Sequence, residues 1–355
     1  MVALALAACD RPVVLTGWHA LGAPSRATPL VTDDLVVLGH DRGLSLVEPE
    51  GKLHCTADLG AAVEGRPVLA GKRIVAATLA ARVVGVDDAC KVVWSVDVGD
   101  RVRADLALAL GRVLVASYDR RLHAILPGRG ERVWTYPERG APPLAGELAG
   151  SGPVVDGNTI YVGDLAGFLH ALDSTSGALR WRHRLGAGLS TPVVATHGAV
   201  IVGSDDGVLT SLAPPDAPGG EPTTRWVLRT EAARSPAARL DAGTLYVASF
   251  DRHVYAVDAD TGRVLWRRAT RGPLLRAPVV TNDLVLVAAG SGDGSLYALD
   301  RATGAELWHH RTGGAIVGEP ALAGSRVWVA STDGSAYLFE LRSRPSPAAV
   351  RTAGP

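Results

Sequence analysis

The sequence predicts an all-β fold, a ring of eight four-stranded blades that forms an eight-bladed β-propeller. Two observations carry this prediction. The stretch "GDGSLYALDRATGAELW", Gly292 to Trp308, recurs with variations along the chain at intervals of about forty residues. Each copy alternates turn signals with short apolar segments, so that one repeat supplies four strands. A repeat of this length with four short strands is typical of a propeller blade.

The elements of one repeat can be read in order from the copy that ends at Trp308. After Pro278 we predict a short inner strand, then a second strand at 285–288, a third at 296–299 and an outer strand that carries Trp308. Asp293-Gly294 is a two-residue hairpin signal. The turn at 300–304 begins with aspartate and ends with glycine, residue types that let a chain reverse.

Prolines mark the start of the inner strands. Proline has no backbone N–H and is tolerated where it precedes or begins a strand. All repeats except the third have such a proline: Pro29, Pro67, Pro153, Pro192, Pro236, Pro278 and Pro320.

A column of tryptophans marks the outer strands. We assign to it Trp18, Trp94, Trp134, Trp181, Trp226, Trp266 and Trp308, while Cys55 takes this place in the first full repeat. Each of these tryptophans is expected to pack between neighbouring blades, and truncation of one to alanine to cost about 3 to 5 kcal/mol.

The ring closes through the two ends of the chain. The stretch 319–340 supplies three strands and no fourth, whereas "VVLTGWHALG", Val13 to Gly22, precedes the first proline and reads as an outer strand. Pairing them completes the eighth blade and leaves no open edge between the first and last blades. We therefore expect the propeller to span residues 10–341, followed by a disordered Pro-rich tail at 342–355.

Charge and cysteine content bear on location. The formal net charge is zero, so no single-sign field favours nucleic acid or an anionic membrane surface. The run "LALAAC", Leu4 to Cys9, resembles a lipoprotein cleavage box, which would make Cys9 the lipid-bearing first residue of the mature protein. No basic residue precedes Cys9, so we expect residues 1–9 to be the remnant of a signal that starts upstream; the alternative is an ordinary apolar N-terminus.

The other two cysteines lie in adjacent repeats. This placement can separate the Cα atoms by more than the ~7 Å that a disulfide allows. We therefore expect Cys55 and Cys90 to be free or buried thiols, with a bridge as the alternative.

The repeats resemble the PQQ-like propeller repeat, whose consensus runs close to "DGxLYALDxxTGxxxW", from Val13 to Glu340. With eight blades, Cys9 and no further domain, the chain resembles the BamB family of lipoproteins. That resemblance implies a non-catalytic periplasmic scaffold, a monomeric subunit that binds the periplasmic domains of a BamA-like barrel insertase and assists outer-membrane protein assembly. It favours the outer membrane, with contact through the lipid anchor only, although Asp10 after Cys9 resembles an inner-membrane retention signal of enteric bacteria.

Cofactor chemistry is not expected. Quinoproteins of this superfamily hold PQQ against two adjacent cysteines and beside a calcium ion, and this chain has neither adjacent cysteines nor a calcium cluster. Asp258–Gly262 and Asp173–Gly177 lack the glutamate that closes a calcium loop and are predicted to be turns. His123 and His170 occupy the column filled elsewhere by tyrosine, so we expect them to pack in place of an aromatic ring. We predict no cofactor, no metal and no catalysis.

The connections between blades are the candidate partner-binding loops. Six residues in them combine positive charge with apolar anchors: Leu189, Arg234, Arg271, Leu274, Leu275 and Arg276. If these connections share one rim, their arginines suit an acidic partner. The alternatives are a solvated rim and leucines that pack inward. Two other functions remain open, a binding module for envelope polysaccharide or another protein, and a small quinoprotein enzyme.

Overall fold

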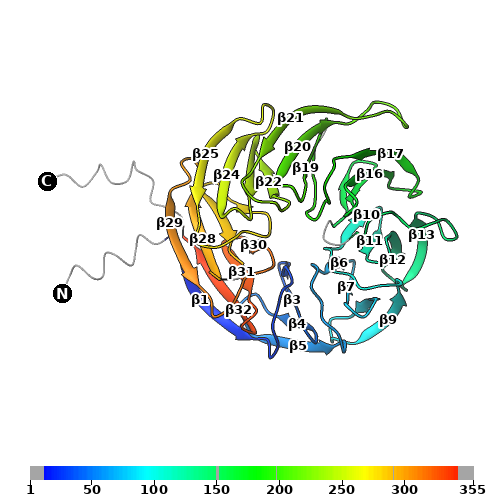
Figure 1. Ribbon diagram of the computed structural model, residues 1–355. Coiled ribbons are helices and arrows are strands. Elements are labelled where there is room, and N and C mark those ends of the chain that lie inside the picture. The colour runs from blue at the N-terminus through cyan, green and yellow to red at the C-terminus, as the bar shows by residue number, and fades with distance from the viewer. Residues whose placement is uncertain (1–11, 149–151, 197, 291, 343–355) are drawn as a thin grey trace, which may run out of the picture.

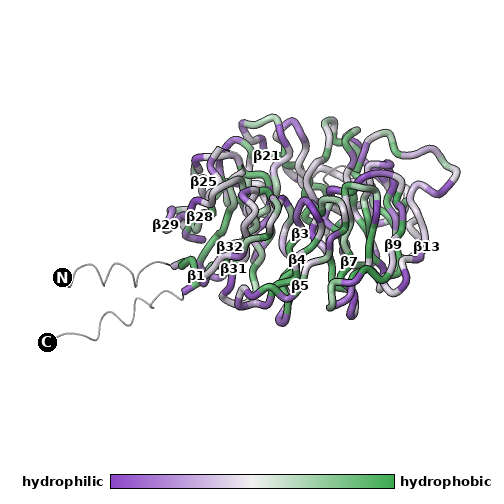
Figure 2. The backbone as a smooth tube through the Cα atoms, turned by 90° about the horizontal axis from the view of Figure 1, so that it is seen from below, coloured by the Kyte–Doolittle hydropathy of each residue, from purple (hydrophilic) through white to green (hydrophobic). Residues whose placement is uncertain are grey.

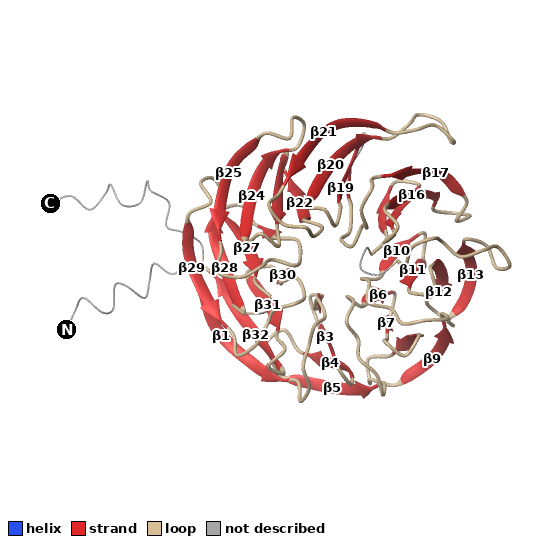
Figure 3. Cartoon of the chain, in the orientation of Figure 1, coloured by secondary structure: helices blue, strands red, loops and turns tan. Residues whose placement is uncertain are grey.

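The computed structural model describes residues 12–148, 152–196, 198–290 and 292–342, and these form a closed ring of eight antiparallel sheets (Figure 1). Each sheet has four strands, and none of the described residues is helical (Figure 3). The predicted eight-bladed propeller is confirmed. The predictions for Cys9 and for the Pro-rich tail fall outside the described residues, except at Arg342. The described part contains no helix that could cross a membrane.

Within each blade the strands follow one another from the channel outward. The inner strands are β2 (Leu30–Val31), β6 (Val68–Ala70), β10 (Ala107–Ala109), β14 (Val154–Asp156), β18 (Val194–Thr196), β22 (Ala237–Asp241), β26 (Val279–Val280) and β30 (Ala321–Ala323). The second strands are β3 (Val36–His40), β7 (Arg73–Ala77), β11 (Arg112–Ser117), β15 (Thr159–Gly163), β19 (Ala199–Gly203), β23 (Thr244–Ala248), β27 (Leu284–Ala288) and β31 (Arg326–Ala330).

The third strands are β4 (Gly43–Val47), β8 (Arg82–Val86), β12 (Arg121–Leu126), β16 (Phe168–Asp173), β20 (Val208–Ala213), β24 (His253–Asp258), β28 (Ser295–Asp300) and β32 (Ser335–Leu341). The outer strands are β5 (Leu53–Asp58), β9 (Val92–Asp97), β13 (Glu131–Tyr136), β17 (Leu179–Arg184), β21 (Thr223–Arg229), β25 (Val264–Ala269), β29 (Glu306–Arg311) and β1 (Val13–Ala20). We number the blades from 1 (β2–β5) to 8 (β30–β32 with β1).

The N-terminal strand closes the ring as predicted. β1 pairs antiparallel with β32, from Val13 opposite Leu341 to Ala20 opposite Ser335. Blade 8 therefore takes three strands from one end of the chain and one from the other. This pairing leaves no open edge between blades 1 and 8.

The hydrophobic core lies between neighbouring blades. The second and third strands are almost wholly buried, because each blade covers both faces with its neighbours. One apolar cluster, for example, joins Leu44 and Leu46 of blade 1 to Ile74 and Val86 of blade 2. Seen edge-on, the hydrophobic segments run along the strands (Figure 2). The core is thus a set of inter-blade seams rather than one central cluster.

Four of the column tryptophans dock on a glycine of the next blade. Their rings meet the turn between its third and outer strands, at Gly130 for Trp94, Gly177 for Trp134, Gly262 for Trp226 and Gly304 for Trp266. A Cβ atom at Gly130 would lie 2.5 Å from the ring of Trp94, and this glycine also has a φ of +71°. Both constraints require glycine.

The docked indoles also form hydrogen bonds across the seam. Nε1 of Trp94 donates to the carbonyl oxygen of Pro127 at 2.8 Å, and Nε1 of Trp226 donates to that of Ala259 at 2.9 Å. Trp266 donates in the same way to Arg301 at 3.0 Å. The repeated tryptophan therefore joins one blade to the next through both packing and a polar contact.

The assignment of Trp18 to this column is wrong. Gly17, not Trp18, lies opposite Leu338, at the position where the other blades have their column residue, and the bulge that precedes this position is common to β1 and the other outer strands. A shift of one residue turns a side chain to the opposite face of its strand. Trp18 is consequently 66% exposed.

Trp328 fills the seam between blades 8 and 1 instead. It lies on the second strand of blade 8, opposite Leu338, and is fully buried against Val36 and Leu38 of blade 1. Its ring lies 3.9 Å from an ideal Cβ position at Gly51 in the blade 1 turn. In this seam the large side chain therefore comes from the second strand, whereas in the other tryptophan seams it comes from the outer strand.

The expectation of free thiols at Cys55 and Cys90 is also wrong, because the two form a disulfide with a Cα–Cα distance of 6.0 Å. Cys55 holds the column position opposite Leu46, and Cys90 has a φ of +62° in the turn of blade 2. These are the places of the tryptophan and the turn glycine in other seams. Adjacent repeats therefore bring the two residues together rather than apart.

Removal of a docked tryptophan should destabilise the ring far more than removal of the exposed one. We expect Trp226→Ala to lower the free energy of unfolding by about 3 to 5 kcal/mol, because Trp226 is buried in a seam and hydrogen-bonded. Trp18→Ala should change it by about 0.5 kcal/mol or less. Urea denaturation of both variants measures the difference, and equal losses would contradict the register given above.

Loss of the disulfide should weaken the seam between blades 1 and 2. The bridge closes a loop with a sequence separation of 35 residues. Replacement of Cys55 and Cys90 by serine should therefore lower the free energy of unfolding by about 3 to 4 kcal/mol. The same urea measurement, with and without reductant, tests this. A reductant effect that persists in the double serine variant would show that the bridge is not its cause.

Candidate partner-binding rim

The connections between blades share one face of the ring, which we call the rim. Because the strands of each blade run up and down in order, the loop after each outer strand lies on the same face as the turn between second and third strands. Backbone hydrogen bonds join the two sets, as from Leu274 N to Ser249 O and from Leu189 N to Asp164 O. The tryptophan-docking turns lie on the opposite face.

The rim turns are held by an aspartate and an aromatic residue from the third strand. The hydroxyl of Tyr255 donates to Asp251 at 2.6 Å, and that of Tyr337 donates to Asp333 at 2.7 Å. Tyr297 makes the same bond to Asp293. These contacts fix the rim turns of blades 6, 7 and 8.

His123 and His170 replace tyrosine in two of these turns, as the sequence predicts. His123 contacts Asp119 at 3.1 Å and His170 contacts Asp164 at 3.2 Å, and both histidines are buried. Among the described residues there is no group of histidines, cysteines and carboxylates that could hold a metal ion.

A cavity of about 580 Å³ opens at the centre of the rim. Its walls come from loops and turns of several blades and include Tyr118, Leu165, Arg234, Phe250 and Leu275. Leu165 and Phe250 are 38% and 37% exposed, so apolar surface is available inside it. A concave surface with a few convergent polar groups is the usual form of a binding site.

Two arginines of the rim cavity are paired with carboxylates. Arg103 donates from Nε to Glu64 at 2.6 Å, and the hydrogen bond with Glu64 raises the pKa of Arg103. Arg26 contacts Asp41 at 2.7 Å. The positive charges of Arg103 and Arg26 are therefore offset by carboxylates of the chain itself.

Arg234 and Arg276 are held differently. The guanidinium of Arg234 lies over the ring of Phe250 at 5.1 Å, and Nε of Arg276 donates to the carbonyl oxygen of Val317 at 3.3 Å. Within the described residues neither forms an ion pair with a carboxylate. Their charges remain available to an acidic group of a partner.

The predicted partner-binding residues divide into three groups. Leu189 and Leu274 are 0% and 2% exposed, so their prediction as contact residues is wrong, because both pack inward beneath the rim. Leu275, Arg234 and Arg276 line the cavity. Arg271 is exposed outside its lining and contacts His309 at 3.1 Å.

The cavity also contains residues that the sequence analysis missed. Phe250 follows a serine in a rim turn, and Glu64 lies in the loop between blades 1 and 2. A large apolar residue in a solvent-facing turn was the available signal for Phe250. No local pattern distinguishes Glu64 from other surface carboxylates.

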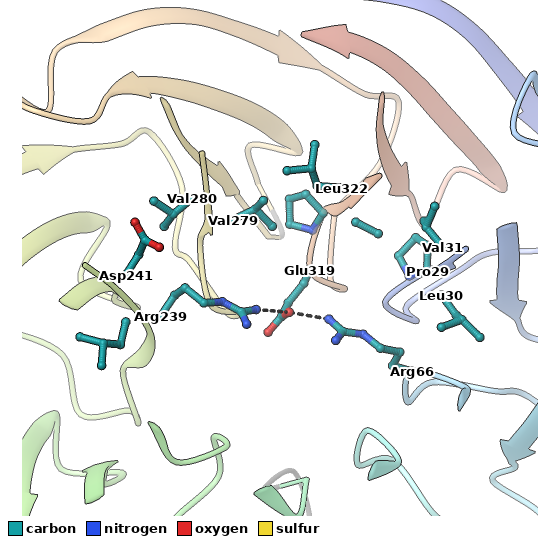
Figure 4. A pocket seen from close by; sticks show the side chains of 13 residues that line it. Pro29, Leu30, Val31, Arg66, Arg239, Asp241, Val279, Val280, Glu319 and Leu322 are labelled. Atoms are coloured by element: carbon teal, nitrogen blue, oxygen red, sulfur yellow. Dashed lines mark hydrogen bonds and ion pairs between the residues drawn. The ribbon is translucent and has the colours of Figure 1, made fainter. Parts of the chain in front are cut away.

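The central channel holds one ion-pair cluster. Glu319, which is 7% exposed, accepts from Arg66 at 2.6 Å and from Arg239 at 3.1 Å (Figure 4). Cavities of about 340 and 390 Å³ adjoin this cluster, and inner-strand residues such as Val279 and Val194 line them. The carboxylate is thus neutralised by two guanidiniums and is not placed as a free base.

The channel residues do not fit a quinone cofactor of the kind the repeat suggests. The two described cysteines are bonded to each other between an outer strand and a turn of the next blade, and neither lines the channel cavities. Arg66 and Arg239 both bind the carboxylate of Glu319, which leaves the cluster with one excess positive charge and no carboxylate free to act as a base or a calcium ligand among these three residues. We derive no chemical step through such a group.

The fold and the repeat define a class, the PQQ-like β-propellers with eight blades. A family model described as "Outer membrane protein assembly factor BamB" matches residues 40–151, 144–218 and 216–343. The chain belongs to this family.

Two curated relatives match part of the chain. The outer membrane protein assembly factor BamB of Xanthomonas campestris pv. campestris is 28% identical over 235 residues, which are 49% of this chain and 58% of that protein. The serine/threonine-protein kinase AfsK of Streptomyces griseus is 32% identical over 172 residues, 45% of this chain and 20% of the kinase. The chain thus spans 58% or less of either relative.

Solved structures share the whole ring. BamB from Moraxella catarrhalis superposes with a TM-score of 0.76 at 18% identity, covering 94% of this chain and 99% of that one. A quinohemoprotein alcohol dehydrogenase from Comamonas testosteroni reaches 0.75 at 14% identity, covering 96% and 78%. At these identities the likeness establishes the fold alone.

Tyr297→Phe tests how the rim turns are held. The variant removes the hydroxyl donor of Oδ2 of the buried Asp293, while Oδ1 keeps the hydroxyl of Ser295, so we expect a loss of about 1.5 to 3 kcal/mol at neutral pH. Burial and the bond to Asp293 raise the pKa of Tyr297 to about 12, against about 10 in an unfolded chain. A raised pKa favours the neutral hydroxyl, so its contribution is complete below pH 10 and is lost as the pH approaches 12.

The measurement is urea denaturation of wild type and variant between pH 7 and pH 12. The stability difference should be constant to about pH 10 and then shrink. A difference that grows with alkaline pH would contradict the assigned hydrogen bond.

Proposed function

We propose that this chain is a non-catalytic scaffold of the bacterial cell envelope that binds a BamA-like barrel insertase and assists outer-membrane protein assembly. The match to the BamB family over residues 40–343 carries the proposal. The same proposal places the lipid anchor on Cys9, on the periplasmic face of the outer membrane. The chain acts as a monomeric subunit of a larger complex.

The disulfide supports an envelope location. Structural disulfides persist in oxidising compartments such as the periplasm and are rare in the cytosol. The bridge from Cys55 to Cys90 stands in a seam where other blades use tryptophan, so the ring relies on it as a structural element.

The rim supports a protein partner rather than a small substrate. Leu275 and Phe250 offer apolar surface, and Arg234 and Arg276 flank it with charges that no described carboxylate neutralises. An apolar side chain next to a carboxylate on the partner would satisfy both features. Arginine and aromatic residues are the types that most often dominate the energy of an interface.

The residues that line the channel support a non-catalytic role. An enzyme would need an acid, a base or metal ligands that converge on a substrate. Here the buried carboxylate of Glu319 is held by Arg66 and Arg239, and the other described residues of the walls are largely apolar. The likeness to a quinohemoprotein dehydrogenase therefore supports a common fold and no more.

Leu275→Asp combined with Arg276→Glu tests the rim. The double variant replaces the apolar anchor and reverses the charge, so the affinity for the periplasmic domains of the barrel insertase should fall by about tenfold or more. Calorimetric titration of the purified proteins measures this. Leu265→Asp with Arg225→Glu is a matched control, because it makes the same charge change on exposed outer strands.

Unchanged affinity in a well-folded rim variant would remove this loop from the interface. Failure of the wild-type ring to bind the insertase would contradict the proposed function. Binding of envelope polysaccharide in its place would favour the binding-module alternative.

A further inference from the structure

β1 differs from the other seven outer strands in having no charged side chain. Its sequence is VVLTGWHA, in which His19 is the one titratable residue. Each of the others carries at least one acid or arginine: Asp58, Asp97, Glu131, Arg180, Arg225, Arg267 and Glu306. Charged side chains normally protect an exposed edge strand from association.

The register of β1 gathers its exposed apolar residues on one side. Leu15 lies opposite Phe339 and Trp18 lies opposite Tyr337, two residues that share a face of β32. The bulge at Thr16 allows Leu15 and Trp18 to occupy this face together. They are 37% and 66% exposed, and Trp18 has the largest exposed fraction among the exposed large apolar residues of the described chain.

A packed aromatic layer supports this patch from beneath. Phe339 contacts the rings of Trp308 at 5.5 Å and His310 at 5.3 Å, and Tyr337 contacts His310 at 5.9 Å. Phe339 is fully buried in the seam between blades 7 and 8. The strand that pairs with β1 is therefore packed firmly against blade 7, and Trp18 projects from β1 at the perimeter.

The short distance along the chain from Cys9 to the start of β1 limits where the exposed apolar side of β1 can lie. Four residues, even fully extended, span about 14 Å. A lipid on Cys9 therefore keeps Val13, and with it the start of β1, close to the surface of the bilayer. Tryptophan is enriched at such membrane–water interfaces, because its ring is apolar and its N–H can remain hydrated.

We propose that the side of β1 carrying Leu15 and Trp18 rests in the interfacial layer of the membrane that holds the lipid. The inference rests on the proposed lipid anchor at Cys9 and adds a second, apolar contact to it. The perimeter of blade 8 then faces the membrane. The rim lies at right angles to that perimeter and stays open to a periplasmic partner.

The test uses the full lipoprotein in phosphatidylethanolamine–phosphatidylglycerol vesicles. An environment-sensitive NBD fluorophore is attached at Trp18→Cys and, as a matched control, at Val133→Cys. Val133 is 42% exposed on β13, which lies across the ring from β1 (Figure 1). Mass spectrometry of each preparation establishes whether Cys9 carries lipid.

We expect nitroxide-labelled lipids to quench the fluorophore at position 18 at least about threefold more strongly than at position 133. Within lipidated protein, equal quenching at both positions would overturn the docking while leaving the anchor and the partner proposal intact. Absence of lipid on Cys9 would overturn the anchor and the docking together. The fluorophore at position 18 could instead become shielded from water only when a barrel protein is added. That result would show that β1 contacts the barrel protein, and it would overturn the membrane contact.

Trp18→Glu provides a second test, with the fluorophore moved to position 15. The substitution places a charge on the patch without touching a seam, so circular dichroism and the disulfide should be unchanged. With NBD at Leu15→Cys in this background, quenching by nitroxide lipids should fall to the level of position 133. Quenching as strong as in the Trp18 protein would contradict the proposed contact.

Discussion

The ring depends on a contact that recurs between neighbouring blades, most often between an outer strand and a turn of the next blade. A blade cannot bury its two faces alone, and this contact fixes the spacing of neighbours around the channel. In four seams an indole packs on a turn glycine. Elsewhere the same role falls to a disulfide between Cys55 and Cys90, and to Trp328 from a second strand. In five seams the contact joins an outer strand to a turn of the next blade, and in the seam between blades 8 and 1 its large side chain comes from a second strand.

The contacts that hold the ring together and the loops proposed to bind a partner lie on opposite faces. The docking turns lie on one face and are constrained by the rings that pack on them. The rim on the other face is fixed by aspartate–tyrosine bonds in blades 6, 7 and 8 and by aspartate–histidine contacts in blades 3 and 4, which leaves its inter-blade loops available for recognition. Arg234, Phe250 and Leu275 belong to these loops and turns, so a partner can be accommodated there without disturbing a seam.

The periodicity of the sequence predicts the fold class, the number of blades and the closure of the ring, because each repeat carries its own turn and strand signals. It does not predict the register of β1, because β1 and β32 come from opposite ends of the chain and no turn between them fixes their pairing. One signal was present: the third-strand residue opposite a column tryptophan is small, as Ala298 is opposite Trp308, whereas Leu338 is not. The leucine already indicated that no tryptophan faces it.

The candidate site was only partly predictable. Spacing placed the inter-blade loops on one rim, but it could not tell which leucines turn inward, and Leu189 and Leu274 are buried. The disulfide was missed for a related reason, because separation along the chain says little about distance across a seam. Pairing of Arg103 with Glu64 depends on two loops that only the closed ring brings together.

The central claim, that the rim is the working face, is tested most directly by site-specific photo-crosslinking in living cells. A photoreactive amino acid at position 275, with position 265 on an outer strand as control, would be irradiated and its adducts identified by mass spectrometry. The account predicts an adduct between position 275 and a barrel insertase of the outer membrane, and none from position 265. An adduct from position 265 in the absence of one from the rim would contradict it.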